Sequence, residues 1–339
     1  MRRALVVLGF VVAAGRGAAP AETHRITAST FYRTFDARHP VLARIKPGDV
    51  VVTKTLDAAG LDEKGERRHP ESGNPLTGPF FVEGAAQGDA LAITFLKIRM
   101  NRSWGYSNYR LGLYALTGGA IEKLYSADYK KDLVLPGRSN AIPWDLDRER
   151  QTVRLREPQS QRIRLEFPAQ PMLGCVGVAP AGAFAPTSGP AGYYGGNMDY
   201  NEVREGATVY LPVSHPGGLL FIGDGHALQG DGEPTGTGIE TSMDVEFSVV
   251  LRKGAGLTGP RVETAEHVIS VGAQAEFESA LDRGLQLATT DMVRWLTGEY
   301  RLEPWAAHQL VAFSGRYDVV TVAGSMALRI PKRHLPRPN

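Results

Sequence analysis

The 339-residue chain has only one cysteine, Cys175, so it cannot form an intrachain disulfide. Free cysteines are among the most buried residue types, and Cys175 is therefore expected to be a small buried residue rather than a nucleophile. The chain also lacks an excess of one charge, because 38 Lys and Arg residues stand against 36 Asp and Glu residues. This balance gives no electrostatic basis for binding nucleic acid or an anionic membrane.

Familiar catalytic motifs are missing as well. The sequence contains no G-x-S-x-G nucleophile elbow, no G-K-[ST] phosphate loop, no H-E-x-x-H helix and no clustered cysteine ligands. These absences disfavour mechanisms that depend on a serine or cysteine nucleophile.

Long apolar runs are absent except at the N-terminus. An Arg-Arg pair follows Met1, the segment from Ala4 to Ala14 is apolar but too short to span a bilayer, and residues 19–21 form a small-residue cleavage site. This pattern predicts a bacterial signal peptide over residues 1–21 and a periplasmic or secreted mature chain that begins near Glu22. A twin-arginine signal and an uncleaved anchor are the alternatives.

Removal of the signal peptide would leave one large unit. It takes away three arginines and changes the formal net charge from +2 to −1. No later stretch is long and apolar enough to cross a membrane, so no membrane contact is expected after cleavage. We expect a single family domain at 22–339, with 22–170 and 171–339 as possible lobes.

The body is predicted to be mainly β. The 39 glycines and 22 prolines are spread along the chain, which is typical of short strands joined by tight turns. Apolar and polar residues alternate around Ile93, Leu165 and Phe247, as in half-buried strands. Further strands are predicted at residues 50–55, 153–155, 208–213, 219–222, 264–271, 318–322 and 326–330.

Helical periodicity is confined to the C-terminal third. Apolar residues recur every three or four positions from Phe277 to Leu296, and again from Leu302 to Phe313 with Pro304 in the first turn. Both stripes are expected to face the core. With no alternating βαβ rhythm, the predicted fold is an α+β antiparallel sandwich or barrel-like body with a few C-terminal helices.

Polar residues are unusually dense in the segment 195–240. Asp224 and His226 are two residues apart, as are Asn197 and Asp199, and such pairs project to the same face of an extended backbone. One imidazole with carboxylate oxygens can bind a divalent ion and leave a position for water. Asp199, Asp224 and His226 are therefore candidate metal ligands. The alternative is that the Gly-Asp-Gly segments are turns whose Asp side chains bond their own backbone.

A second polar cluster lies in the N-terminal half, at Asp57, Asn74 and Glu83. Glu83 follows the apolar run 80–82, where partial desolvation would raise the pKa of its carboxyl toward a value useful for proton transfer. The alternative is a glutamate in water at the end of a strand.

The sequence resembles the acetamidase/formamidase family. The motifs that carry the resemblance, in family order, are residues 73–79 with 82–89, 177–180, 195–199 and 223–233, followed by weaker similarity at 306–314 and 330–332. The resemblance implies a β-rich fold, a homo-oligomer, and hydrolysis of a formamide-like or acetamide-like amide to carboxylate and ammonia. It also implies that the polar residues of these motifs line the active site.

Amide hydrolysis needs a polarised carbonyl, an activated water and a proton for the departing amine. With a metal at the three ligands, Glu83 is predicted to be the general base, and Asp57 and Glu233 are further catalytic candidates. Side-chain amides match the donor and acceptor of the substrate. The predicted substrate-binding residues are Asn74, Asn197 and Gln229, and Glu240 is a further candidate for a supporting role.

Several alternatives remain open. A metal-free scheme would pair a glutamate with Lys54. A different class of function is an exported carbohydrate-binding or ligand-binding module with structural calcium, although calcium prefers six to eight oxygen ligands over imidazole, so zinc is the favoured ion. Tyr193, Tyr194 and a charged loop with His69 suggest an amide larger than formamide.

Overall fold

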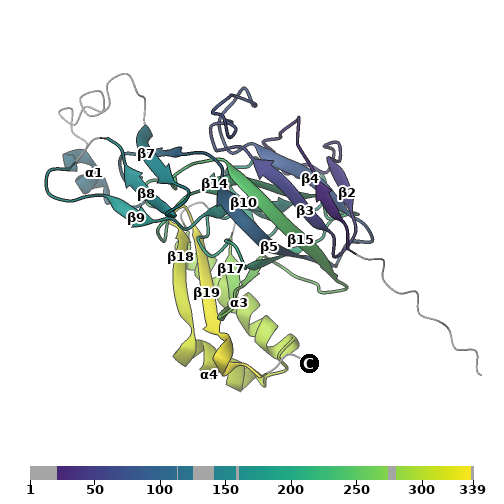
Figure 1. Cartoon of the computed structure of the whole chain (residues 1–339). Coiled ribbons are helices and arrows are strands. Elements are labelled where there is room, and N and C mark those ends of the chain that lie inside the picture. The colour runs from purple at the N-terminus through teal and green to yellow at the C-terminus, as the bar shows by residue number, and fades with distance from the viewer. Residues whose placement is uncertain (1–20, 113, 125–140, 158–159, 274–279, 337–339) are drawn as a thin grey trace, which may run out of the picture.

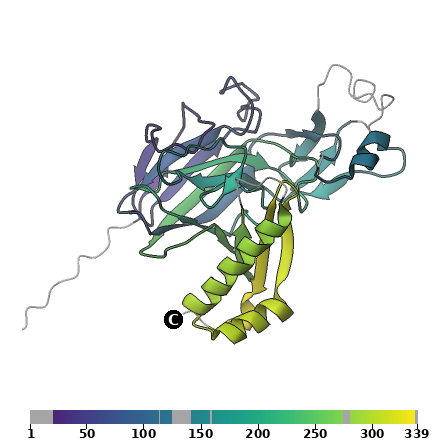
Figure 2. The same cartoon turned by 180° about the vertical axis from the view of Figure 1, so that it is seen from behind.

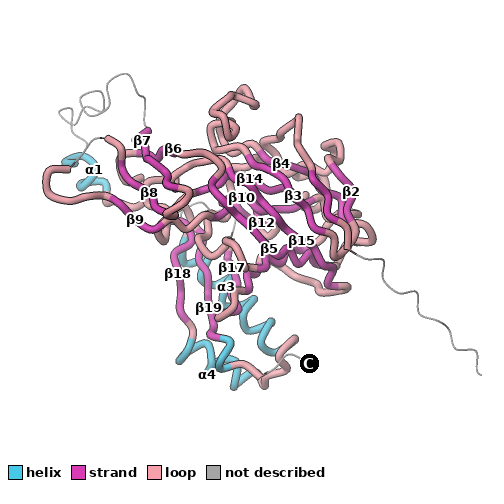
Figure 3. The backbone as a smooth tube through the Cα atoms, in the orientation of Figure 1, coloured by secondary structure: helices cyan, strands magenta, loops and turns pink. Residues whose placement is uncertain are grey.

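A computed structural model gives the arrangement of the chain. It describes residues 21–112, 114–124, 141–157, 160–273 and 280–336. With 39% strand and 12% helix it confirms the mainly-β prediction (Figures 1 and 3). Nearly all of the predicted signal peptide lies outside the described residues. None of the described helices is long and apolar enough to span a membrane.

The largest sheet has nine strands and extends from the N-terminal body into the C-terminal third. Its neighbours are antiparallel except for the parallel pair formed by the first two strands. In spatial order they are β1 (Thr23–Arg25), β3 (Val50–Thr55), β15 (Met243–Arg252), β5 (Ala90–Met100), β13 (Thr208–Pro212), β16 (Arg261–Glu263), β17 (His267–Gly272), β19 (Ser325–Pro331) and β18 (Arg316–Thr321).

A six-stranded sheet packs against the first part of the nine-stranded sheet, and the two share one hydrophobic core (Figure 1). Its spatial order is β11 (Ala191–Gly192), β12 (Gly195–Asn197), β10 (Met172–Val178), β14 (Leu220–His226), β4 (Leu76–Val82) and β2 (Ala43–Ile45). Every residue of β10 and β14 is buried, so neither strand alternates between buried and exposed residues as a half-buried strand does. By contrast, β15 alternates buried and less buried residues along most of its length.

The remaining elements flank this sandwich. A four-stranded sheet on one side consists of β6 (Trp104–Asn108), β7 (Ala141–Asp147), β8 (Thr152–Leu155) and β9 (Glu166–Pro168), with α1 (Gly118–Leu124) beside it (Figure 1). The C-terminal helices are α3 (Leu281–Gly298) and α4 (Pro304–Ser314), followed by the short 3-10 helix η1 (Lys332–His334). Figure 2 shows α3 lying across the C-terminal strands, where Met292 and Leu296 pack with Val268, Leu328 and Ile330 in a second core.

Most predicted elements are confirmed, and three need correction. The strand around Leu165 shrinks to the short β9, and Ile163 is 60% exposed because β9 is an edge strand away from the core. The strand predicted at 264–271 begins later, as β17 (His267–Gly272), because residues 264–266 form the turn that follows β16 (Arg261–Glu263). The second helical stripe does not face the core, since Phe313 is 85% exposed and Ala307 is the buried residue of α4. Phe277, the start of the first stripe, lies outside the described residues.

The two helices should therefore respond differently to truncation. Met292→Ala on α3 removes a fully buried side chain and should lower the free energy of unfolding by about 2–5 kcal/mol, because it leaves a cavity against the sheet. Phe313→Ala on α4 removes a larger but exposed side chain and should change it by less than about 0.5 kcal/mol. Urea denaturation of both variants measures this, and equal losses would contradict the packing described.

Candidate functional site

The last residues of β14 bring an aspartate and a histidine into the protein interior. Asp224 and His226 are 2% and 1% exposed. The end of β14 is held by Thr241, whose N–H donates to Gly225 O, and by a bridge between His226 and Glu240. The period-two prediction placed this pair correctly, and the bridge adds a carboxylate that the sequence marked only as supporting.

Two further carboxylates come from loops. Asp199 follows β12, which pairs with β10, and Glu233 lies in the loop between β14 and β15. The four carboxylates and the imidazole form two overlapping groups that share His226, and within each group the ligand atoms lie within 4.8 Å of one another. These groups are Asp199, His226 and Glu233, and Asp224, His226 and Glu240. We call the five residues the acidic cluster.

Backbone strain gathers at the same place. Among the described residues, seven other than glycine have a positive φ, and four of them are predicted site residues: Asn74, Asp199, Asp224 and Glu233. The left-handed conformation costs a residue with a side chain about 1–3 kcal/mol and persists where the surrounding structure imposes it, which is common at functional sites. The strained backbone at these four residues therefore lowers the stability of the fold and fixes the direction of their side chains.

The histidine presents a free nitrogen to the carboxylates. Gln229 Nε2 donates to the backbone oxygen of Asp199, so its Oε1 is the atom 2.8 Å from His226 Nδ1. Because Oε1 can only accept, Nδ1 carries a proton and Nε2 is left with its lone pair in the neutral imidazole. Nε2 lies 3.0 Å from Glu240 Oε1 and 3.5 Å from Asp224 Oδ1. The short distance to Glu240 lacks hydrogen-bond geometry, since Nε2 has no hydrogen-bond partner.

Orphaned atoms mark the centre of the cluster. Seven buried side-chain polar atoms lack a hydrogen-bond partner in the described chain, and four belong to the cluster: Asp199 Oδ1, Asp224 Oδ1, His226 Nε2 and Glu240 Oε2. Each such atom costs about 1–3 kcal/mol when nothing replaces its water. A divalent cation beside His226 Nε2 would give such atoms a ligand bond in place of water, and the donor set of one imidazole and carboxylates is one that zinc accepts.

Burial and mutual repulsion shift the ionisation of the cluster. Burial raises the pKa of Glu233 to about 8 and that of Glu240 to about 7. Burial, followed by the charges of Glu233 and Asp224, raises the pKa of Asp199 well above its usual range. Burial alone would lower the pKa of His226, but the charges of Glu240 and Asp224 outweigh it and raise that pKa. Without a cation, the cluster therefore retains protons near neutral pH.

Two glycines make room for the cluster. A Cβ at Gly174 would collide with Asp199 Oδ1 and would lie 2.6 Å from Asp224 Oδ2. A Cβ at Gly238 would lie 2.6 Å from His226 Nδ1. These contacts explain why β10 and the loop before β15 carry glycine there. The sequence offered no local signal for either position, because both contacts join distant segments.

The predicted catalytic residue Glu83 does not join the cluster, so that assignment is corrected. It is exposed and lies just beyond the end of β4. The other end of β4 is nearer the cluster, since Leu76 pairs with Gly223, and the six steps of the strand span about 20 Å. Lys54, the lysine of the metal-free alternative, pairs with Glu63 at 2.7 Å, and both side chains are partly exposed.

Asp57 has a structural role in place of the predicted catalytic one. Its Oδ2 accepts from Arg102 at 2.6 Å, and its Oδ1 accepts from the N–H groups of Ala59 and Leu61. Both oxygens thus accept from fixed donors, and the Arg102 guanidinium balances the charge of the carboxylate. It holds the loop after β3 in place.

The predicted substrate-binding amides contact the cluster itself. Gln229 bridges His226 and Asp199, as described above. Asn197 Nδ2 donates to Asp199 Oδ2 at 2.6 Å, and Asn74 Nδ2 donates to Asn197 Oδ1 at 3.1 Å. Gln229 and Asn197 therefore bond directly to residues of the cluster, and Asn74 reaches it through Asn197.

The residues expected to enlarge the substrate site lie elsewhere. Tyr194 is fully buried, and its ring packs against Phe35. Tyr193 accepts a hydrogen bond from the backbone of Ala181. His69 is exposed and bonds within its own loop to Glu71. None of these contacts supports a larger amide.

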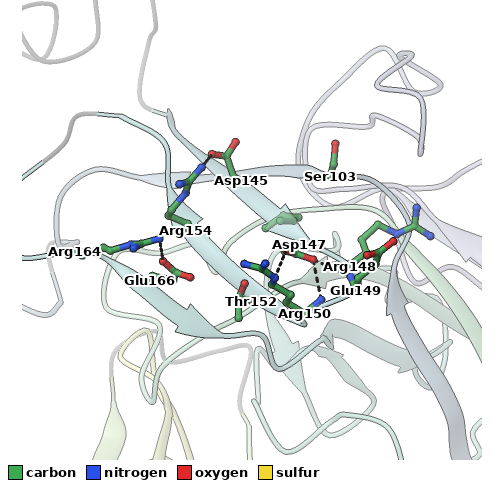
Figure 4. Close-up of a pocket in the computed structure, with 11 residues that line it drawn as sticks. Ser103, Asp145, Asp147, Arg148, Glu149, Arg150, Thr152, Arg154, Arg164 and Glu166 are labelled. Carbon is green, nitrogen blue, oxygen red and sulfur yellow. Dashed lines mark hydrogen bonds and ion pairs between the residues drawn. The ribbon is translucent and has the colours of Figure 1, made fainter.

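A cavity of about 770 Å³ on the four-stranded sheet provides a contrast (Figure 4). Its charged side chains are largely paired with one another, for example Arg154 with Asp145 at 3.0 Å and Arg150 with Asp147 at 3.8 Å. The pairs are solvent-exposed, so they leave no unmet charge to attract a ligand. The acidic cluster, buried and unpaired, is the stronger candidate site.

Comparisons with known proteins find similarity to acetamidases and formamidases. The model described as the Acetamidase/Formamidase family matches residues 177–280. The chain is similar to the crystal structure of an acetamidase from Yersinia enterocolitica, with a TM-score of 0.76, 27% identity and 96% of each chain covered. It is 26% identical to the formamidase of Methylophilus methylotrophus over 63% of this chain and 62% of that protein. It is 27% identical to the acetamidase of Mycolicibacterium smegmatis over 53% of each. The matches thus span somewhat more than half the length of these two curated relatives.

The stability of chelator-treated protein should depend on pH. Glu233 and Glu240 hold protons in the folded state up to about pH 8 and 7, whereas their unfolded values are near 4.5. In that window the folded state binds more protons than the unfolded state, so their contribution to stability is lost as the pH rises from about 5 to 8. Urea denaturation across this range measures the slope.

Two controls isolate the cluster. Glu233→Gln removes one titrating group and should make the slope shallower, and saturating Zn²⁺ should abolish the loss because a cation replaces the protons. A slope that is identical in wild type, variant and Zn²⁺-saturated protein would contradict the ionisation described.

Proposed function

This chain belongs to the acetamidase/formamidase family, and we propose that it cleaves the C–N bond of a small linear amide at the acidic cluster with the help of a divalent cation. The observation that supports the cation is a set of four buried atoms without a hydrogen-bond partner, one histidine nitrogen and three carboxylate oxygens, in residues of the two ligand groups that share His226. The products would be a carboxylate and ammonia.

The proposed ligands are Asp199, Asp224 and His226, with Glu240 completing the set. Zinc is the proposed ion, because calcium would need more oxygen ligands and little imidazole. The same argument disfavours an exported carbohydrate-binding or ligand-binding module with structural calcium. When bound, such an ion would polarise the amide carbonyl and lower the pKa of a nearby water.

Glu233 is the proposed proton-transfer group. Burial raises the pKa of its carboxyl to about 8, close to the pH at which a general base works best, and its carboxylate lies beside Asp199 and His226 in one ligand group. It would take a proton from the water that adds to the carbonyl carbon. As the C–N bond breaks, it would return that proton to the departing nitrogen.

Gln229 and Asn197 prepare the site rather than react. Gln229 fixes the His226 tautomer that leaves Nε2 unprotonated, and Asn197 holds one oxygen of Asp199. Gly174 and Gly238 allow the backbone to approach the cluster closely, which leaves little room around it. This confinement favours a formamide-like or acetamide-like substrate over a large one.

Export and self-association belong to the same proposal. The N-terminal Arg-Arg pair and apolar run support secretion into the periplasm or medium with cleavage near Glu22. The apolar side chains Trp305 and Phe313, which are 67% and 85% exposed on α4, are compatible with a homo-oligomer.

Removal of the histidine should release the ion. His226→Ala should lower bound metal, measured by mass spectrometry of the purified protein, and should lower ammonia release from acetamide and formamide in parallel, because the only imidazole donor of the cluster is lost. His69→Ala is the matched control, since that imidazole is exposed on a distant loop. Full metal content in His226→Ala would refute His226 as a ligand.

Removal of the proton carrier should slow the chemical step. Glu233→Gln preserves the size of the side chain and should lower kcat by about two to four orders of magnitude, the usual worth of a general base. Glu83→Gln, on the exposed turn after β4, is the control and should retain wild-type kcat. A change in KM alone in Glu233→Gln would instead mean that Glu233 only holds the substrate.

A further inference from the structure

The single cysteine lies at the edge of the acidic cluster, in contact with an amide that the cluster uses. Cys175 in β10 is the cross-strand partner of Asn197 in β12. Its Sγ donates to Asn197 Oδ1 at 2.8 Å, the same oxygen that accepts from Asn74. The other end of that amide donates to Asp199 Oδ2. Cys175 is therefore one hydrogen-bonded residue away from a proposed metal ligand.

The chemistry of the groups fixes the direction of this chain of hydrogen bonds. A carboxylate that binds a cation is ionised and can only accept, so the NH₂ end of Asn197 must face Asp199 in the cation-bound protein. The carbonyl end then faces away from the cluster and needs donors, which Asn74 and Cys175 provide. Burial raises the pKa of the Cys175 thiol well above its usual range, so the thiol keeps the proton that it donates. An apolar side chain at this position would leave Asn197 with one donor fewer.

The orientation of Asp199 follows from that of Asn197. With Oδ2 bound to Asn197, the other oxygen, Oδ1, is the orphaned atom directed at the cluster over Gly174. If the amide turned around, its oxygen would face the carboxylate and repel it. Asp199 would then lose both its partner and its fixed direction.

We propose that Cys175 is a positioning residue, whose thiol holds the Asn197 amide in the orientation that leaves Asp199 Oδ1 free to bind the divalent cation. The inference rests on the proposed function for the presence of that cation. It assigns to the cysteine a role that is neither nucleophilic nor merely space-filling. The closest general parallel is the hydrogen bonding that orients metal ligands from behind, which typically contributes 10-fold to 100-fold to metal affinity.

The test compares Zn²⁺ affinity in three variants, measured by competition of chelator-treated full-length protein with a chromophoric chelator. Cys175→Ala removes the donor and should weaken Zn²⁺ binding by about 10-fold or more. Cys175→Ser restores a donor to the same oxygen and should recover affinity to within about threefold of wild type. Val176→Ala is the matched control on the same strand, because it removes buried volume without touching the amide and should leave affinity unchanged while lowering stability.

Cys175→Ala protein that binds Zn²⁺ with wild-type affinity would overturn the proposal. Equal weakening of Zn²⁺ binding in Cys175→Ala, Cys175→Ser and Val176→Ala would also overturn it, because it would indicate a packing effect. If Cys175→Ala does not fold, Asn74→Ala removes the other donor to Asn197, and unchanged Zn²⁺ binding there would overturn it equally. A wild-type chain that binds no Zn²⁺ would also defeat it. Ammonia release from formamide, measured separately on wild type, decides the proposed hydrolysis, so binding without hydrolysis would refute the function and leave the role of Cys175 supported.

Discussion

Repulsion among buried carboxylates is the constraint around which this molecule is organised. Asp199, Asp224, Glu233 and Glu240 share the protein interior with one imidazole, at distances where their charges interact strongly. Taken out of water without compensation, such a group of anions would destabilise the fold, and protons can relieve only part of that cost. A positive charge among these residues would offset the repulsion, and the buried atoms without hydrogen-bond partners are the reason for proposing a cation there.

The surrounding fold supplies the rigidity that holds the carboxylates together. β10 and β14 lie inside the six-stranded sheet, are buried along their whole length, and present their small residues where the cluster needs space. Residues in the left-handed conformation then turn three of the five cluster members toward the centre, a cost that the large shared core of the two sheets offsets. Side-chain amides occupy the outward-facing atoms, so the inward-facing atoms remain for ligand and substrate.

The sequence predicted what depends on local pattern. The strand at 50–55 appears with the predicted bounds, and Asp224 and His226, predicted to project to the same face, lie in one group of possible ligand atoms. The sequence could not show which residues the pairing of strands brings together. Glu83 lies in one of the motifs that resemble the family, but β4 pairs with β14 in the antiparallel direction, so Glu83 follows the end of β4 that is far from the acidic cluster. Asp57 was misread for a similar reason, because its partner Arg102 lies 45 residues away. Cys175 and Gly174 gave no signal, since their roles exist only across strands.

The most direct test of this account is a crystal structure of the purified protein with anomalous diffraction data recorded on both sides of the zinc absorption edge. The account predicts one anomalous peak at the acidic cluster, about 2.0–2.2 Å from His226 Nε2 and from carboxylate oxygens that include those of Asp224. A cluster without a metal peak, in which His226 Nε2 donates to Glu240 and the carboxylates share protons, would contradict it.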